Sequence, residues 1–250
     1  MRVYQFRHPS KIELSHLNLL TAKPEVVYIS GLDMQKKKSY PGFFLVFEGG
    51  EGCGKSTQLR QLARTLSREG IPIVLTREPG GTPLGKGIRQ LLLHAKHKVS
   101  PEAELFLYEA DRAHHVASVV KPALSCGQVV LSDRHADSTA VYQGMARGMH
   151  HAETLNSLAT SGLTPDLVII LDVPPEIGLA RVRGRGAPDR LEREKMAFHK
   201  KVRKGFLALA KKNSRRYRVF NGTGDPKEIG QEIQRLVKTR LERKGLWPQH

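Results

Sequence analysis

Short apolar runs recur along this chain, and each run ends in polar residues or glycine. Five of them are rich in Val, Ile and Leu, a composition that is typical of strands buried on both faces of a sheet. These runs are Phe43–Phe47, Ile71–Thr76, Val129–Asp133, Leu167–Val173 and Tyr217–Phe220. Segments of helical period lie between or after them, namely Ser56–Arg68, Ala103–Leu124 and Met196–Lys212. This alternation predicts an α/β fold of three layers, with a five-stranded parallel sheet between helices.

The first forty residues do not continue this alternation, and Met34 is a plausible alternative start. We therefore predict an extension at residues 1–40, disordered or outside the core, followed by one domain at residues 41–245. A chain of 250 residues is long enough for one such domain and short for two. Gly and Pro cluster at Glu78–Gly87 and Gly184–Pro188, which marks these segments as loops that carry function.

Composition narrows the class of protein. No apolar run approaches the ~18 residues of a membrane helix, and the beginning of the chain has no secretory pattern, so a cytoplasmic location is expected. The two cysteines, Cys53 and Cys126, lie far apart and lack zinc-ligand spacing. The net charge of +17 favours acidic partners, but a solvated basic face explains it equally well, and nucleic acid is not the expected partner.

A complete phosphate-binding motif follows the first predicted strand. Its glycines allow the backbone N–H groups and the following helix N-terminus to face phosphate oxygens. Lys55 would place its charge on the β- and γ-phosphates, and the Ser56 hydroxyl would be a ligand of Mg²⁺. The motif therefore predicts a site for the phosphates of a nucleotide, and other residues must decide between a switch, a motor and a kinase. Its residues are Gly49, Gly50, Glu51, Gly52, Cys53, Gly54, Lys55 and Ser56.

Cys53 lies within this motif, close to the start of a helix. Such a position lowers the pKa of a thiol, so the sequence predicts a reactive Cys53 that bound ATP and Mg²⁺ protect.

Five stretches are similar to those of the bacterial thymidylate kinases, over roughly residues 42 to 240. They are FEGGEGCGKS at Phe47–Ser56, TREPGGT at Thr76–Thr82, ELFLYEADRAHHV at Glu104–Val116, DRHADSTAVYQGMARG at Asp133–Gly148 and RVRGRGAPDRLE at Arg181–Glu192. The resemblance implies a P-loop nucleoside-monophosphate kinase that moves the γ-phosphoryl group of ATP to dTMP with Mg²⁺. It also implies a homodimer.

Asp133 and Arg134 end the third predicted strand, at the edge where open α/β sheets bind ligands. In the similar family the aspartate lies near Mg²⁺ and the arginine clamps phosphate groups, a task that suits a bidentate guanidinium. Glu51 corresponds to an acid near the acceptor's sugar and phosphate, and Arg77 and Pro79 to the loop that fixes this phosphate. Without the resemblance, Asp133 and Arg134 could be an ion pair that finishes a strand.

The resemblance also assigns residues to the base of the acceptor. Tyr108 corresponds to an aromatic that stacks on thymine, and Arg112 to an arginine that bonds a base carbonyl. Thr139, Tyr142 and Gln143 match the stretch that faces base and sugar, with Tyr142 crowding the 2′ position of a ribose. By spacing alone, Tyr108 is more typical of a core aromatic.

Four arginines, at 181, 183, 185 and 190, resemble the lid of the family, at about residues 181–192. Arginines two residues apart cannot share one helix face, so a flexible lid that wraps phosphate is predicted, with a solvated charge cluster as the alternative. Some relatives carry an arginine where this chain has Gly52. Its absence indicates a catalytic arginine from the lid, Arg185 first and Arg181 second; Asp189 and Glu192 match positions that approach the acceptor.

The sequence is thus interpreted as a thymidylate kinase in which Lys55, Asp133, Arg134, Arg185 and Glu51 serve catalysis. Two alternatives stay open. One is a kinase for another monophosphate, and the other is a P-loop ATPase that binds nucleic acid.

Overall fold

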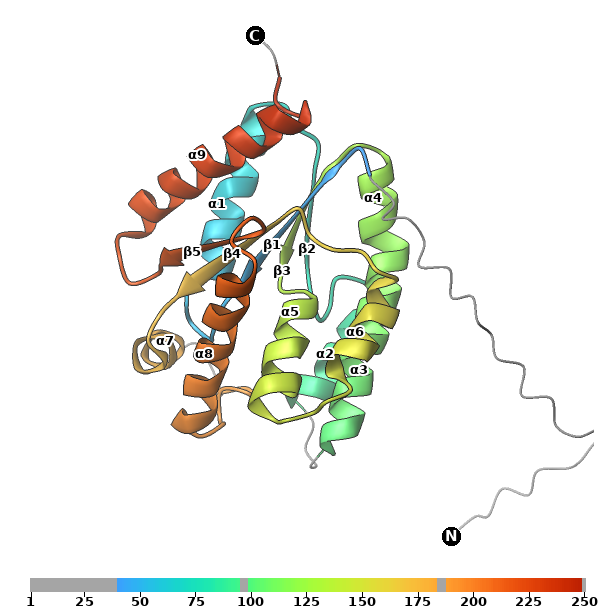
Figure 1. Ribbon diagram of the computed structural model, residues 1–250, viewed down its shortest axis with the longest axis vertical. Helices are drawn as coiled ribbons and strands as arrows, with labels where there is room; N and C mark the ends of the chain where they lie inside the picture. Colours follow the sequence, from blue (N-terminus) through green and yellow to red (C-terminus); the bar gives the residue numbers. More distant parts are fainter. Residues whose placement is uncertain (1–39, 95–98, 184–187, 249–250) are drawn as a thin grey trace, which may run out of the picture. The chain divides into compact units, whose positions relative to one another are not determined.

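A computed structural model of the chain describes residues 40–94, 99–183 and 188–248. Apart from Tyr40, the expected extension at residues 1–40 lies outside the described residues. The described part contains a five-stranded, all-parallel sheet in the order β2-β3-β1-β4-β5 (Figure 1). Its strands are β1 (Phe43–Glu48), β2 (Ile73–Arg77), β3 (Val129–Asp133), β4 (Leu167–Asp172) and β5 (Tyr217–Asn221). The predicted fold class is confirmed.

Helices connect the strands and cover both faces of the sheet (Figure 1). They are α1 (Lys55–Arg68), α2 (Pro83–His94), α3 (Pro101–His115), α4 (Lys121–Ser125), α5 (Ala136–Thr139), α6 (Ala152–Thr160), α7 (Pro175–Val182), α8 (Met196–Lys212) and α9 (Pro226–Lys244), with π-helical turns η1 (Val116–Val120) and η2 (Ala140–Ala146). The predicted helix Met196–Lys212 is found as such. The predicted helix Ala103–Leu124 is formed by α3, η1 and α4 in succession.

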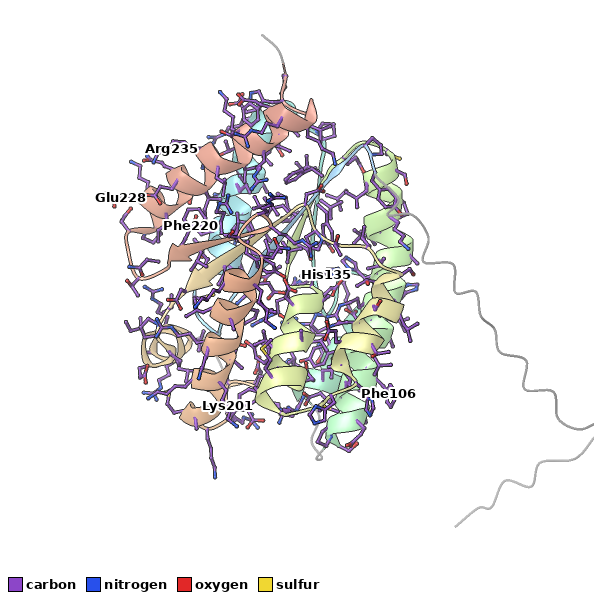
Figure 2. The ribbon with its side chains drawn as sticks, viewed as in Figure 1. Phe106, His135, Lys201, Phe220, Glu228 and Arg235 are labelled. Atoms are coloured by element: carbon purple, nitrogen blue, oxygen red, sulfur yellow. The ribbon has the colours of Figure 1, made fainter. Side chains whose placement is uncertain are left out.

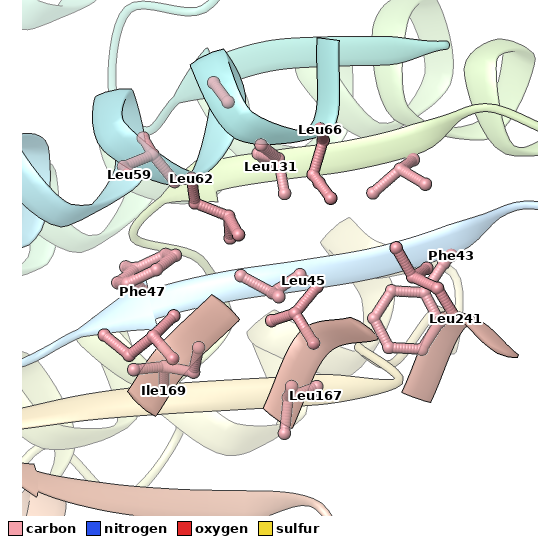
Figure 3. Close-up of a cluster of buried hydrophobic side chains, with 14 of the residues drawn as sticks. Phe43, Leu45, Phe47, Leu59, Leu62, Leu66, Leu131, Leu167, Ile169 and Leu241 are labelled. Carbon is pink, nitrogen blue, oxygen red and sulfur yellow. The ribbon is translucent and has the colours of Figure 1, made fainter. Parts of the chain in front are cut away.

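Alternate residues of the central strands pack into two separate cores. Phe43, Leu45 and Phe47 of β1 face α1 and α9, where Leu62 and Leu241 meet them (Figure 3). The intervening residues of β1, Phe44 and Val46, belong to the core on the other face, together with residues of α4, η2 and α8. The sheet is therefore the middle layer of three, because successive side chains of a strand point to opposite faces.

The two outer strands differ from the prediction of burial on both faces. Only Tyr217 is fully buried in β5, and no residue of β2 is. Leu75 and Val219 are both more than two-fifths exposed. The physical reason is the strand order, since β2 and β5 are the edges of the sheet and each has one neighbouring strand instead of two.

The register of the parallel strands brings their carboxyl ends to one edge of the sheet. Phe47 of β1 and Arg77 of β2 both pair with Asp133 of β3. The loops after these three strands therefore begin side by side, which is where ligands bind in open α/β sheets. Among the described residues, no helix has the length and apolar character needed to cross a membrane.

Candidate active site

The P-loop, residues 49–56, leaves β1 and enters α1 at its first residue, Lys55. Gly54 precedes the helix with φ of 99°, in the left-handed region where glycine is the favoured residue. The Lys55 ammonium folds back over the loop and donates hydrogen bonds to the carbonyl oxygens of Gly49 (3.1 Å) and Gly50 (2.9 Å). The loop is thus closed around a lysine whose charge lies beside the exposed N–H groups of a helix N-terminus, an arrangement that binds anions.

Gly52 has a second role in this loop. Its φ is 65°, and a Cβ atom built at this position would collide with the carbonyl oxygen of Gly178 in α7. A Cβ at Gly178 would in turn collide with the carbonyl oxygen of Glu51. The start of α7 therefore packs directly on the P-loop, and this packing excludes any side chain, including an arginine, at position 52.

Ser56 and Asp133 join the P-loop to the end of β3. The Ser56 hydroxyl donates to a carboxylate oxygen of Asp133 across 2.6 Å. These are hard oxygen donors of the kind that Mg²⁺ prefers, and they lie beside the phosphate-binding loop. The oxygen donors of this pair therefore fit a magnesium ion. Among the described residues, no group of three or more His, Cys, Asp or Glu side chains forms a separate metal cluster.

A cavity of about 560 Å³ opens over the P-loop. Its walls include Lys55, Ser56 and Asp133. Gly222 and Gly224 of the β5–α9 connection and Pro226 and Ile229 of the first turn of α9 also line it. The sequence did not identify this connection, because it carries no motif, and only its place at the carboxyl end of β5 reveals it.

A narrower cavity of about 80 Å³ adjoins the first. Four wall residues are common to both cavities, namely Glu51, Arg89, Arg134 and Asp189. The cavities therefore meet at these residues, and we call this place the junction. The narrow cavity brings together many of the residues that the sequence assigned to the acceptor. They are Pro79, Tyr108, Thr139, Tyr142 and Gln143.

Glu51, Arg134 and Tyr142 form one hydrogen-bonded group at the junction. Arg134 donates to the Glu51 carboxylate (2.8 Å), and the Tyr142 hydroxyl donates to the same oxygen (2.6 Å). Burial raises the pKa of Glu51, but the charges of Arg134 and Lys55 outweigh it and lower this pKa to about 2. Burial also raises the pKa of Tyr142 well above its usual value. At neutral pH the group therefore holds a carboxylate, a guanidinium and a neutral phenol.

The backbone of Arg134 adopts an unusual conformation. Its φ is 73°, a region that residues with a Cβ rarely occupy. The buried Glu48 carboxylate stabilises the turn that follows by accepting from the backbone N–H groups of His135 (2.9 Å) and Ser138 (3.1 Å). Strain of this kind is typical of functional positions, and here it directs the guanidinium to the junction of the cavities.

Three arginines gather around the junction. Arg89 of α2 lines both cavities and Arg77 of β2 lines the larger one, as does Arg134. Burial lowers the pKa of Arg89, and the neighbouring charges of Arg77 and Arg134 lower it further. Like charges held together in this way favour binding of a dianion such as a phosphate. The sequence missed Arg89 because no motif surrounds it.

Arg112 differs from its expected position. It is 2% exposed, lies outside the walls of both cavities, and contacts Glu78 (2.9 Å), Glu109 (2.7 Å) and Thr139 (2.9 Å). The Thr139 hydroxyl oxygen accepts the bond from Arg112 and so belongs to this network. The structure thus places Arg112 in a buried network behind the cavity wall, and the contact with a base that the resemblance implied stays a prediction.

Glu78 links the same network to two histidines. Its carboxylate accepts from Nδ1 of His115 (2.8 Å) and Nδ1 of His135 (3.0 Å), the latter labelled in Figure 2. Burial raises the pKa of Glu78, but His135 and Arg112 oppose this effect and hold it well below its usual value. A buried anion therefore anchors the loop that carries Arg77 and Pro79.

The lid is described in part. Arg185 lies outside the described residues, so its position relative to the site stays a prediction. Arg181 lines the larger cavity and donates to the carbonyl oxygen of Gly222 across 2.8 Å. Asp189 lies in the wall of both cavities and Glu192 in that of the larger one, and the two join through a hydrogen bond from the Asp189 backbone N–H to Glu192.

Comparisons with known proteins agree with this geometry. A family model described as "Thymidylate kinase" matches residues 47–233. A curated thymidylate kinase of Carboxydothermus hydrogenoformans is 51% identical over 199 residues, which cover 79% of this chain and 97% of the relative. That of Thermosynechococcus vestitus is 47% identical over 217 residues, covering 82% and 90% of the two chains. The family match spans the P-loop, both cavities and the described part of the lid, and this chain belongs to the thymidylate kinase family.

Proposed function

We propose that this protein transfers the γ-phosphoryl group of ATP to dTMP, giving ADP and dTDP. The observation that carries the proposal is the junction of two cavities of different character. One is built on a P-loop and the other is lined by aromatic and amide side chains, and arginines lie where they meet. A donor and an acceptor bound on either side would have their phosphates in contact.

ATP occupies the larger cavity in this proposal. The P-loop N–H groups and Lys55 hold its β- and γ-phosphates, and the nucleoside extends toward the β5–α9 connection. A bound Mg²⁺ would supply positive charge that offsets part of the negative charge of these phosphates. Ser56 and Asp133 would hold it, because they supply paired oxygen donors 2.6 Å apart at the loop and at the end of β3.

The acceptor occupies the narrow cavity. The base lies between Tyr108 and Gln143, and the phosphate points to Arg77, Arg89 and Arg134. Tyr142 is fixed by its hydrogen bond to Glu51, so its ring forms a rigid wall beside the sugar. A rigid ring of this kind excludes a 2′-hydroxyl group sterically and favours a deoxyribose.

Catalysis would consist of positioning and charge stabilisation, without a covalent intermediate. An oxygen of the acceptor phosphate attacks the γ-phosphorus while the bond from that phosphorus to the β-phosphate oxygen breaks. Lys55 and Arg134 face the transferred group from two sides and stabilise its charge in the transition state. Since position 52 excludes a side chain, the remaining cationic group comes from the lid, with Arg185 as the first candidate and Arg181 as the second.

The same proposal includes a homodimer. Leu84, Leu91, Phe106 and Leu158 are each more than half exposed and lie on α2, α3 and α6, helices that pack against one another (Figure 2 labels Phe106). Large apolar side chains on one layer of helices favour burial against a second copy. Sedimentation of the protein and of Phe106→Lys would test this: a dimer that the substitution dissociates is expected, and a monomeric wild type would contradict it.

We also propose that residues 41–245 are the catalytic domain, that residues 1–40 are dispensable, and that the protein works in the cytoplasm. A protein shortened to begin at Met34 should keep the turnover and thermal midpoint of the full chain.

The direct test of the reaction is to follow the labelled γ-phosphate. Wild-type protein with labelled ATP, Mg²⁺ and dTMP should yield labelled dTDP in equal amount to the ADP formed. ADP without labelled dTDP, especially if DNA increases its formation, would instead indicate an ATPase that acts on nucleic acid.

A further inference from the structure

Glu104 is a buried carboxylate just outside the acceptor cavity. It lies on α3, is 1% exposed, and is not a wall residue of either cavity. Oε1 accepts hydrogen bonds from Nε2 of Gln143 (2.6 Å) and Nε of Arg147 (3.2 Å), and Oε2 pairs with Arg190. None of these contacts is required by the phosphate chemistry of the site.

The contact with Gln143 determines which way its amide faces. A carboxylate between two guanidinium groups can only accept hydrogen bonds, so the amide group that faces it must be the NH₂. In the reversed orientation the amide oxygen would lie 2.6 Å from a carboxylate oxygen without a proton between them, which is repulsive. Glu104 therefore locks the amide in one of its two orientations.

The carbonyl oxygen of Gln143 is left for the cavity. Gln143 is a wall residue of the narrow cavity, and among the described residues none donates a hydrogen bond to its Oε1. The neighbouring Thr139 hydroxyl oxygen already accepts a hydrogen bond from Arg112. The wall beside the base thus presents a hydrogen-bond acceptor, the Gln143 carbonyl oxygen, and Glu104 fixes its orientation from outside the cavity.

A hydrogen-bond acceptor beside the base distinguishes pyrimidines by whether their N3 atom carries a hydrogen. Thymine and uracil carry an N–H donor at N3, whereas cytosine carries a bare lone pair there. A fixed carbonyl oxygen bonds the first two rings and repels the third.

We propose that Glu104 is a positioning residue that sets the pyrimidine preference of the acceptor cavity through the Gln143 amide. This inference rests on the proposed function, since it assumes that the narrow cavity holds the acceptor's base. It assigns the rejection of cytosine to a side chain that touches no substrate.

The test compares kcat/KM for dTMP with that for dCMP. Glu104→Gln replaces the acceptor-only partner by an amide that can also donate, so the Gln143 amide can turn its NH₂ toward the base. The dTMP/dCMP ratio should fall at least about tenfold, mainly through a higher KM for dTMP. In a Gln143→Leu background, Glu104→Gln should change the ratio no further, because its effect passes through that amide.

Arg147→Met is the matched control. It removes another partner of Glu104 but leaves the bond to Gln143, so the ratio should stay within about twofold of wild type. If Glu104→Gln does not fold, Glu104→Asp is used, because it keeps the charge but is too short to reach Gln143. The same fall in the ratio is expected.

A wild-type ratio in the Glu104 variants, or an equal effect of Glu104→Gln with and without Gln143, would overturn the inference. Failure of the proposed function is distinguishable, because it would appear as a wild-type protein that does not phosphorylate dTMP.

Discussion

The guanidinium of Arg134 donates a hydrogen bond across 2.8 Å to the carboxylate of Glu51. Both residues are walls of both cavities, so this ion pair lies where the two substrates of the proposed reaction would meet. Arg134 also donates hydrogen bonds to the hydroxyl oxygens of Ser138 and Tyr142, so its guanidinium group is held on several sides. The pair therefore presents a cation of fixed orientation to an incoming phosphate.

Arg134 and Arg185 should differ in their kinetic effects. Arg134→Ala should weaken dTMP binding and lower turnover, because the Arg134 guanidinium would bind the acceptor phosphate in the ground state as well as in the transition state. Arg185→Ala should lower kcat by roughly a hundredfold or more and change the Kd for dTMP little, if it acts mainly in the transition state. Calorimetry and single-turnover rates measure the two quantities. Near-normal turnover in Arg185→Ala would move the role to Arg181 or Arg183.

Arg89 should matter for binding and not for folding. It contacts the carbonyl oxygen of Pro79 (3.0 Å) and lies near two other cations. We expect Arg89→Met to raise the KM for dTMP at least about tenfold, because one of three charges that face the phosphate is lost. The thermal midpoint of the free protein should stay equal or rise, since repulsion from Arg77 and Arg134 is relieved. An unchanged KM would remove Arg89 from the acceptor site.

Glu48 should make the protein less stable as pH rises. Burial raises its pKa from 4.5 to about 7, an effect that Arg134 opposes only in part. Because the folded-state pKa is the higher one, the contribution of Glu48 to stability is full below pH 4.5 and is lost as pH rises to about 7. The shift from 4.5 to about 7 corresponds to roughly 3 kcal/mol.

The measurement is urea unfolding of wild type and Glu48→Gln between pH 4 and 8. The glutamine keeps an oxygen for the N–H groups of His135 and Ser138, so the variant should gain stability relative to wild type by up to about 3 kcal/mol across this range. Glu176→Gln, an exposed carboxylate on α7, is the control and should show no such trend. A difference between Glu48→Gln and wild type that does not vary with pH would contradict the assignment.

Cys126 should react with thiol reagents before Cys53. The sequence predicted a reactive Cys53, but the structure buries it at 2% exposure in the core next to the P-loop, whereas Cys126 is exposed. Access limits a thiol as much as its pKa does. Peptide mass spectrometry after brief labelling should find Cys126 modified first, with or without ATP and Mg²⁺. Preferential labelling of Cys53, with protection by nucleotide, would restore the original prediction.

The sequence predicted those features that depend on neighbouring residues in the chain. The P-loop is one continuous motif, and the apolar runs of β1, β3 and β4 follow directly from burial on both faces. Features that depend on the assembled fold were missed. Arg89 and the β5–α9 connection carry no local signal, and their roles arise only when the sheet brings its carboxyl ends together.

Burial was the other property that the sequence left undetermined. The burial of Arg112 depends on Glu78 and Thr139, which lie 34 and 27 residues away along the chain. In the same way, the partial exposure of Leu75 and Val219 depends on the strand order, which no apolar pattern encodes.

The proposed function requires that the narrow cavity bind dTMP as a phosphoryl acceptor. The most direct measurement is the initial rate of ADP formation by the wild-type protein with ATP and Mg²⁺, across dTMP, dUMP, UMP, dCMP and AMP. We expect kcat/KM for dTMP to exceed that for UMP and AMP by at least about tenfold, because Tyr142 would exclude a 2′-hydroxyl and the cavity would fit a pyrimidine. Equal turnover of AMP and dTMP would contradict the proposed function.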